Sequence, residues 1–207
     1  MGSENPNVAR GDATRQRLLE VACELFGTQG YEATSVETVL QVAGVSRGSL
    51  YHHFASKAAL FAAVVELVET RVGSEVAAAA AGVTDPEGLL RSGSREWIRL
   101  AGDRRVQRIL LIDAPSVLGW EEWRSLEERH ALGLVKAILE AAAGAGSIPR
   151  DMVDIMSHAL LAAVNEIALM VARSEDPETA MHTGTEVVDR LLGGLFDGAR
   201  ADDVAST

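Results

Sequence analysis

One stretch of this chain, residues 35–57 with the sequence SVETVLQVAGVSRGSLYHHFASK, restricts the possible fold more than any other part. Its first part carries apolar residues at helical spacing, namely Val36, Val39, Leu40 and Ala43. Gly44 follows where a tight turn needs a positive φ, Val45 can fill the core beneath that turn, and Ser46 can cap a second short helix. A turn this short forces the two helices to cross steeply, which is the helix-turn-helix geometry.

The residues on either side carry helix start and stop signals. Thr34 is expected to be the N-cap of the first short helix, with Glu37 at its third position completing a capping box. An amphipathic helix precedes it and ends at Gly30, a predicted left-handed cap. Ser56 is expected to cap a long fourth helix.

The second short helix, residues 46–54, has too few apolar residues to be explained by core packing alone. Leu50 and Phe54 lie four residues apart and can anchor one face. The remaining face carries hydrogen-bonding or small side chains, which suits a phosphate-lined groove, and we interpret this segment as a DNA recognition helix. The competing interpretation is an ordinary solvated helix face.

Each residue of this face has an expected role that follows from its hydrogen-bonding groups. Arg47 and His52 can reach phosphates or guanine edges, and Ser49 can bond to either. Tyr51 and Lys57 suit phosphates, and a glycine among these residues lets the helix approach the sugar–phosphate backbone. The predicted DNA contacts are Thr34, Ser35, Ser46, Arg47, Gly48, Ser49, Tyr51, His52 and Lys57.

The composition favours an all-α protein. Apolar residues make up 47% of the 207 residues but aromatic residues only 4%, and no segment alternates with period two over the length of a strand. The single cysteine, Cys23, excludes an intrachain disulfide, and we expect it to pack as a small hydrophobe. The polar N-terminus is no signal peptide and the longest apolar runs are too short to span a bilayer, so we expect a soluble, cytoplasmic protein.

The net charge of −11 argues against nucleic-acid binding unless the charge is unevenly distributed. Residues 1–57 carry five basic and six acidic groups, so a net −10 lies on the remaining 150 residues. Between Gly44 and Lys57 there is no carboxylate, and Arg47 and Lys57 give that segment a charge of +2. Because this basic patch is modest, we expect one copy to bind DNA weakly and dimerisation to double the contacts.

The residues around this motif also resemble those of a known family. The matching positions, in order and spacing, are Phe26, Gly30, Tyr31, Thr34, Ser35, Ala43, Gly44, Val45, Ser46, Gly48, Leu50, Tyr51, Phe54 and Lys57. This arrangement closely resembles the tetracycline-repressor-like (TetR/AcrR) family of transcriptional regulators over residues 12–72. The resemblance implies a three-helix helix-turn-helix head, a linking fourth helix, and an all-helical C-terminal domain that dimerises and binds a small effector.

The chain is accordingly divided into four parts. They are a disordered N-terminus at 1–11, a DNA-binding head at 12–72 with its helix-turn-helix at 35–54, a C-terminal effector-binding and dimerisation domain at 73–200, and a frayed tail at 201–207. About nine helices are expected in all, those of the second domain lying at 85–101, 104–112, 117–143, 149–174 and 177–199. A break is expected at residues 113–116.

The last two long helices are apolar on more than one side, which indicates burial on more than one side. We expect them to pair with their symmetry mates as a four-helix dimer interface. Elsewhere in the domain, tryptophans and a few polar residues can line a mostly apolar cavity, with His130 on an apolar stripe that includes Leu126 and Leu134. The family resemblance implies that such a cavity binds a small, largely apolar effector. The candidates are Trp97, Trp120, Trp123, His130, His158 and Asn165, for each of which core packing is the competing interpretation.

Two short motifs raise an enzymatic alternative, and neither has the required context. Residues 44–48 match G-x-S-x-G, but that motif works on a strand-to-helix turn and here a helix precedes it. Gly144 and Gly146 follow a helix and lack the third glycine of a dinucleotide fingerprint. The five histidines show no metal-ligand spacing. We therefore expect no catalytic residue, metal or cofactor.

Together these observations predict a cytoplasmic, nucleoid-associated homodimer that regulates transcription, with no membrane partner. We expect a repressor that binds double-stranded DNA at a palindromic operator and is released when an effector shifts the population of its conformations. The alternative is a ligand-independent DNA-binding or architectural protein. The operator, the effector and the sign of regulation have no signature in the sequence.

Overall fold

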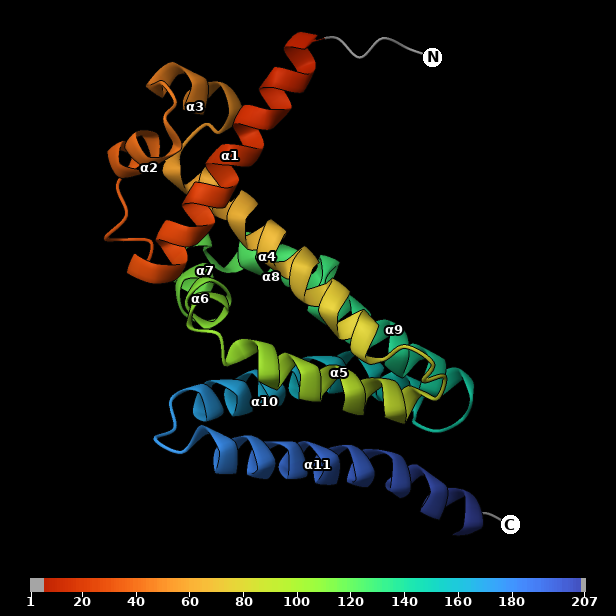
Figure 1. The fold of residues 1–207 in the computed structure, drawn as a ribbon. Coiled ribbons are helices and arrows are strands. Elements are labelled where there is room, and N and C mark those ends of the chain that lie inside the picture. Colours follow the sequence, from red (N-terminus) through yellow and green to blue (C-terminus); the bar gives the residue numbers. More distant parts are fainter. Residues whose placement is uncertain (1–5, 206–207) are drawn as a thin grey trace. The chain divides into compact units, whose positions relative to one another are not determined.

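The computed structural model describes residues 6–205, and every regular element within this range is a helix (Figure 1). The predicted all-α fold is therefore confirmed. The helices form two compact units. The head unit contains the chain up to Val68 together with Arg104–Glu121, and the second unit contains Glu69–Asp103 and the chain from Glu122 onward.

The head unit is held together by one apolar core. Its helices from the N-terminal part of the chain are α1 (Pro6–Gln29), α2 (Val36–Ala43), α3 (Arg47–His53) and the start of α4 (Lys57–Ala79). The large side chains that they bury completely include Leu18, Phe26, Val39, Leu50, Leu60 and Phe61. The Phe26 and Phe61 rings meet edge to face at 5.2 Å, an arrangement that aromatic pairs prefer.

The turns between these helices follow from local signals. Gly44 lies between α2 and α3 with a φ of 70°, the left-handed conformation predicted for it. Ser46 caps α3 by accepting the backbone N–H of Ser49 at 3.2 Å. Ser56 caps α4 by accepting the backbone N–H of Ala59 at 3.0 Å. These three predictions are confirmed.

The predicted N-cap of α2 is wrong by one residue. Ser35 is the cap, because its hydroxyl oxygen accepts the backbone N–H of Thr38 at 3.0 Å. Thr34 is buried, and its hydroxyl donates to the carbonyl oxygen of Gly30 at 2.8 Å. Since that hydroxyl is already engaged by the end of α1, the cap passes to the next hydroxyl residue along the chain.

Both ends of the described chain are more helical than predicted. Helix α1 begins at Pro6, so the disorder predicted for residues 1–11 is wrong from that residue onward. Helix α11 continues to Ala205, so most of the segment 201–207 that was expected to be frayed is helical. Residues 1–5 and 206–207 lie outside the described range.

The segment Arg104–Glu121 packs within the head unit. The predicted division of the chain into two domains near residue 72 does not include this return of the chain to the head. It contains α6 (Arg104–Val106), a π-helical turn η1 (Gln107–Asp113) and α7 (Ala114–Leu118). Helical backbone continues from η1 into α7, so the predicted break at residues 113–116 is wrong; the proline there lies in the first turn of α7, where it is tolerated. The chain turns instead at Gly119, which has a φ of 77°.

Polar side chains of this segment hold the C-terminal end of α1. The backbone N–H of Tyr31 donates to Oδ2 of Asp113 at 2.8 Å, and Nε of Arg108 lies 3.5 Å from the same oxygen. Arg105 forms an ion pair with Glu24 on α1. A buried carboxylate that is distant in sequence thus fixes the start of the loop leading into α2.

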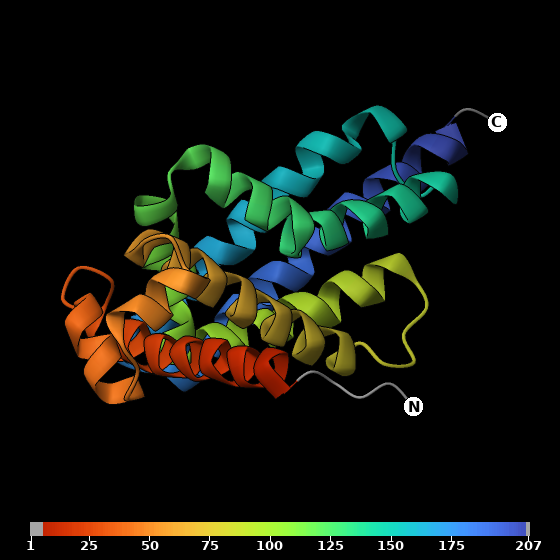
Figure 2. The ribbon, with the colours of Figure 1, turned by 90° about the horizontal axis from the view of Figure 1, so that it is seen from above.

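The second unit is a helical bundle. It contains the rest of α4, α5 (Pro86–Ala101), most of α8 (Trp120–Arg129), α9 (Ala131–Gly144), the 3-10 turn η2 (Arg150–Met152), α10 (Val153–Ala172) and α11 (Pro177–Ala205). Helix α10 packs against α5, α9 and α11, and it lies side by side with α11 in both views (Figure 1 and Figure 2). Gly184 permits this approach, because an added Cβ would lie 2.9 Å from a methyl group of Ile167.

The long helix predicted at residues 117–143 is interrupted. His130 has a φ of −119° and a ψ of −104°, which ends α8 and starts α9 on a new axis. The predicted stripe through Leu126 and Leu134 is therefore not continuous: Leu126 is buried, whereas Leu134 is exposed. Helix α9 buries Leu132 and Leu139 in its place.

One helical stretch, Arg150–Ala172, is long and apolar enough to cross a membrane by length and composition, with a mean hydropathy of 1.7. The expectation that every apolar run is too short for this was therefore wrong. The stretch consists of the turn η2 and helix α10, and α10 packs against three other helices of its unit. Core helices of soluble bundles have the same composition, because they are apolar on more than one side.

Candidate nucleic-acid interface

Helix α3 turns most of its polar residues to solvent. Its inner side is anchored by Leu50 and by Phe54 at its C-cap, both of which are buried. The exposed residues are Ser46, Arg47, Gly48, Tyr51 and His52, while Ser49 is half-buried. The expectation that this side faces away from the core is confirmed for these exposed residues.

Two residues at the N-terminus of α2, in the same head unit, were predicted to contact DNA, and they differ in exposure. Ser35 is exposed and its hydroxyl lies 2.9 Å from that of Thr38. Thr34, predicted as a second phosphate contact here, is fully buried. Of these two residues, the structure therefore presents only the side chain of Ser35 to solvent.

The guanidinium of Arg47 is already engaged within the protein. Its Nη2 donates to Oε1 of Glu37, which links the first turn of α3 to the first turn of α2. A backbone hydrogen bond at Glu37 and, next, the hydrogen bond from Arg47 lower the pKa of the Glu37 carboxyl. The carboxylate therefore remains charged at neutral pH and stays a partner for Arg47.

The second cation of the surface, Lys57, is also held. Its ammonium nitrogen lies 4.0 Å from the centroid of the Tyr31 ring, a cation–π contact. Burial, and secondarily the Glu32 carboxylate, raise the pKa of Tyr31, so its hydroxyl stays protonated. The ring packs edge to face on Phe61 at 5.1 Å, which connects the ammonium group to the core of the head.

Sequence reasoning missed two of the residues that shape this surface. Glu37 was assigned to a capping box, although it is the only carboxylate between Ser35 and Lys57, and this signal could have identified it as a partner for Arg47. Asp113 gave no such signal, because it lies 82 residues from its partner Tyr31.

In the second unit, five of the six residues predicted to line an effector pocket lie on α5, α8 and α10 or at the junction of α8 and α9. The indole Nε1 of Trp97 donates to Oδ1 of Asn165 at 2.9 Å. His158, seven residues before Asn165 and hence on the same side of α10, lies 3.3 Å from Nη1 of Arg124. Arg124 in turn lies over the Trp123 ring at 5.0 Å.

The two remaining candidates are placed differently. His130 is half-buried at the break between α8 and α9. Trp120 is 65% exposed and belongs to the head unit, so it is not grouped with the others. The structure thus brings together Trp97 with Asn165 and, around Arg124, Trp123 with His158.

A buried carboxylate that the sequence did not indicate completes the group around Arg124. Glu127 is 7% exposed and accepts a hydrogen bond from Nη1 of Arg124 at 2.9 Å. Burial raises the pKa of Glu127, although the charge of Arg124 opposes this shift. An ion pair in this position gives the region both a donor and an acceptor for a polar group of a ligand.

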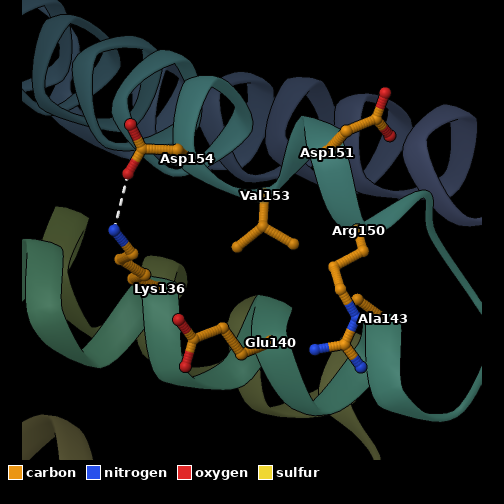
Figure 3. Close-up of a pocket in the computed structure, with 7 residues that line it drawn as sticks. All are labelled: Lys136, Glu140, Ala143, Arg150, Asp151, Val153 and Asp154. Carbon is orange, nitrogen blue, oxygen red and sulfur yellow. Dashed lines mark hydrogen bonds and ion pairs between the residues drawn. The ribbon is translucent and has the colours of Figure 1, made fainter.

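A separate groove of about 360 Å³ lies between α9 and the start of α10 (Figure 3). None of the predicted pocket residues lines it; the lining residues are Lys136, Glu140, Ala143, Arg150, Asp151, Val153 and Asp154. Nζ of Lys136 donates to Oδ1 of Asp154 at 2.6 Å across the groove. Its walls carry charges of both signs, unlike the mostly apolar cavity expected for the effector.

Within the described residues, no group of three or more His, Cys, Asp or Glu side chains could hold a metal ion.

Two family models match this chain. Residues 18–64 match bacterial regulatory proteins of the tetR family, and residues 88–195 match the tetracyclin repressor-like C-terminal domain. The second match alone covers more than half of the chain.

Curated relatives and solved structures agree with these models. The transcriptional regulator AcrR of Shigella flexneri is 45% identical over 60 residues, which are 29% of this chain and 28% of that protein. The transcriptional repressor AcnR of Corynebacterium glutamicum is 33% identical over 123 residues, 54% of this chain and 65% of that protein. A TetR-family regulator from Pectobacterium atrosepticum superimposes with a TM-score of 0.72 and 27% identity, over 91% of this chain and 96% of that one.

The curated matches are partial. The matched segments span about a quarter of the length of AcrR and of UidR from Escherichia coli. The structural match to the Pectobacterium protein, by contrast, extends over nearly the whole of both chains.

Proposed function

The chain belongs to the TetR family of bacterial regulatory proteins, and on this premise we propose that it is a homodimeric repressor released from a palindromic operator by a small effector. As a family member it is a DNA-binding transcriptional regulator rather than an enzyme. The observation that carries the proposal is the exposed polar side of α3, anchored from behind by Leu50 and Phe54. AcnR, named a repressor, supports the sign of regulation.

In this proposal each head places α3 in the major groove of one operator half-site. Arg47, Ser49 and His52 contact base edges, because their donors match the acceptors of guanine and adenine. The remaining contacts are to phosphates, from Ser35, Ser46, Gly48, Tyr51 and Lys57. Thr34 does not belong to this set, because its side chain is buried and its backbone N–H donates to the carbonyl oxygen of Tyr31. The domain that carries these contacts is residues 12–72, and residues 73–200 form the effector and dimerisation domain, except for the segment Arg104–Glu121, which belongs to the head unit.

The dimer is proposed to form through α10 and α11. Large apolar side chains are exposed on these helices, namely Ile155, Met170, Val187 and Leu191, with Met152 just before α10. A run of exposed apolar side chains along two adjacent helices is typical of a surface that a second copy covers. Pairing doubles the phosphate contacts, which a head with a charge of only +2 on residues 44–57 needs for strong binding.

The effector is proposed to bind near Trp97 and Asn165 and the group around Arg124, with His130 at its border. These residues supply apolar surface and a few polar groups, as a ligand site requires. Helix α4 runs without interruption from the head unit into the second unit, so a change in the second unit can reach the heads. A soluble regulator of this kind works in the cytoplasm on the nucleoid.

The experiment that tests the function is selection of bound duplexes from random DNA, followed by a screen for compounds that release the best duplex. Recovery of a palindrome and release by an apolar compound that also quenches tryptophan fluorescence are the expected results. A protein that selects a sequence but shows neither quenching nor release with any compound would instead be a ligand-independent DNA-binding protein.

A further inference from the structure

The ion pair between Glu37 on α2 and Arg47 on α3 lies on the surface that faces DNA in the proposed function. The two side chains are 58% exposed (Arg47) and 65% exposed (Glu37), so neither fills the core. Exposed ion pairs contribute little to the stability of a fold. The pair is therefore better explained by an effect on binding than by an effect on folding.

The charges of this surface make Glu37 unusual. It is the only carboxylate in residues 35–57, and it stands against one of the two fixed cations there, Arg47 and Lys57. Glu37 lies in the first turn of α2, where the helix dipole favours a negative charge. Arg47 lies in the first turn of α3, where the dipole disfavours a positive charge. The carboxylate thus stabilises the guanidinium at a position that is otherwise unfavourable for it.

This arrangement has different consequences for random DNA and for an operator. Binding to random DNA comes almost entirely from neutralised phosphates, so a carboxylate on the surface repels the duplex and cancels part of the Arg47 charge. At a guanine, the planar fork of Arg47 can donate to O6 and N7, and arginine has five N–H groups, enough to keep one on Glu37. A fork that is already oriented loses less conformational freedom when it binds.

We propose that Glu37 is a specificity-determining residue of the DNA-binding surface: it repels phosphates and orients the Arg47 fork toward a guanine edge. The energetic consequence is that Arg47 strengthens binding at the operator and contributes little on other sequences. This inference rests on the proposed contact of Arg47 with DNA, and it adds a residue that binds no base itself.

The test compares the wild-type protein with Glu37→Gln, which keeps the shape and removes the charge. Dissociation constants are measured by fluorescence anisotropy for the duplex selected from random DNA and for a scrambled duplex of equal length, at several salt concentrations. Glu37→Gln should strengthen binding to the scrambled duplex by at least about threefold, the scale of one exposed charge pair. Binding to the selected duplex should change less, so the ratio of the two constants falls.

Glu32→Gln is the matched control, because Glu32 is an exposed carboxylate of the same head, outside residues 35–57. It makes the same change in net charge and should leave the ratio of the two constants unaltered. In an Arg47→Ala background, Glu37→Gln should no longer lower this ratio, since the repulsion of phosphates that remains is the same for both duplexes. Circular dichroism melting curves check that each variant is folded.

Four results would overturn the inference. An unaltered ratio in Glu37→Gln, or an equal fall in Glu32→Gln, would show that Glu37 has no special role. A fall that persists in the Arg47→Ala background would show that the carboxylate does not act through Arg47. If the wild-type protein selects no sequence at all, the proposed function and this inference fail together, whereas each of the other three results leaves the function intact.

Discussion

At the scale of single residues, the two cations of residues 44–57 have protein partners before DNA is present. Arg47 donates to Glu37, and Lys57 lies over the ring of Tyr31. Binding to DNA therefore changes surroundings that already contain protein contacts, and the energy of each new contact is the difference between two states. Phosphate contacts should contribute equally to all sequences, whereas base contacts should contribute to one sequence.

Substitutions in α3 and at the first residue of α4 should distinguish base contacts from phosphate contacts. Arg47→Ala should weaken binding to the selected operator by about 1–3 kcal/mol and relax preference at one base pair, because a bidentate contact is lost. Tyr51→Phe and Lys57→Ala should weaken all duplexes alike, and Lys57→Ala should lower the salt slope by about one per head. Anisotropy titrations against the operator and its single-base variants measure both effects. If Arg47→Ala weakened binding to all of these duplexes equally, Arg47 would contact a phosphate instead of a base.

Asp113 should be important for the stability of the head although it faces no ligand. Asp113→Ala removes the acceptor of the Tyr31 backbone N–H in a buried position, which should cost about 1–3 kcal/mol of unfolding free energy. Urea denaturation followed by circular dichroism measures this change. Asp151→Ala serves as the control, since Asp151 is exposed and should change the unfolding free energy by no more than about 0.5 kcal/mol.

At the scale of elements, the α2–turn–α3 unit depends on two glycines for different reasons. Gly44 has a φ of 70°, a conformation that a residue with a Cβ adopts at a cost. Gly48 lies inside α3, and an added Cβ there would meet no atom within 4 Å. The structure therefore needs a glycine at the first position, and only the proposed approach to DNA needs one at the second.

Alanine substitutions should distinguish the structural role of Gly44 from the proposed DNA-binding role of Gly48. Gly44→Ala should lower the unfolding free energy by about 1–2 kcal/mol, because it strains the turn. Gly48→Ala should raise it by about 0.5–1 kcal/mol, because alanine favours the helix, and should weaken DNA binding through its methyl group. Denaturant titrations and anisotropy on both variants provide the measurements. Unchanged DNA affinity in Gly48→Ala would contradict the close approach of α3 to the backbone.

At the scale of the whole molecule, the proposed affinity for DNA comes from assembly. The net charge of −11 and the modest +2 of residues 44–57 make a single head a weak binder. The exposed apolar side chains on α10 and α11, including Ile155 at 76% exposure, provide the surface for pairing. Two linked heads gain from their high effective concentration at the second half-site.

A charge on that surface should disrupt the dimer without unfolding the chain. Ile155→Glu should yield a monomer by size-exclusion chromatography with light scattering, and should weaken operator binding by about 100-fold or more through the loss of avidity. Leu134→Glu is the matched control, since Leu134 is an exposed leucine on α9 outside the proposed interface. A dimer that persists in Ile155→Glu, or a wild-type monomer at micromolar concentration, would refute an interface at this position.

The sequence by itself determined the local parts of this protein. Helices α2, α3 and α4, the left-handed turn at Gly44 and the caps at Ser46 and Ser56 were predicted because each depends on residues only a few positions apart. The outward side of α3 was predicted for the same reason, since helical spacing places Leu50 and Phe54 on one side.

Only the tertiary structure decided which distant surfaces meet. The Asp113–Tyr31 bond joins residues 82 positions apart, and the Trp97–Asn165 bond joins residues 68 positions apart. The same holds for the segment Arg104–Glu121, which joins the head unit despite its place in the chain. Such contacts form when whole helix faces pack, and the spacing of residues within one helix carries no information about the partner that its face will bury.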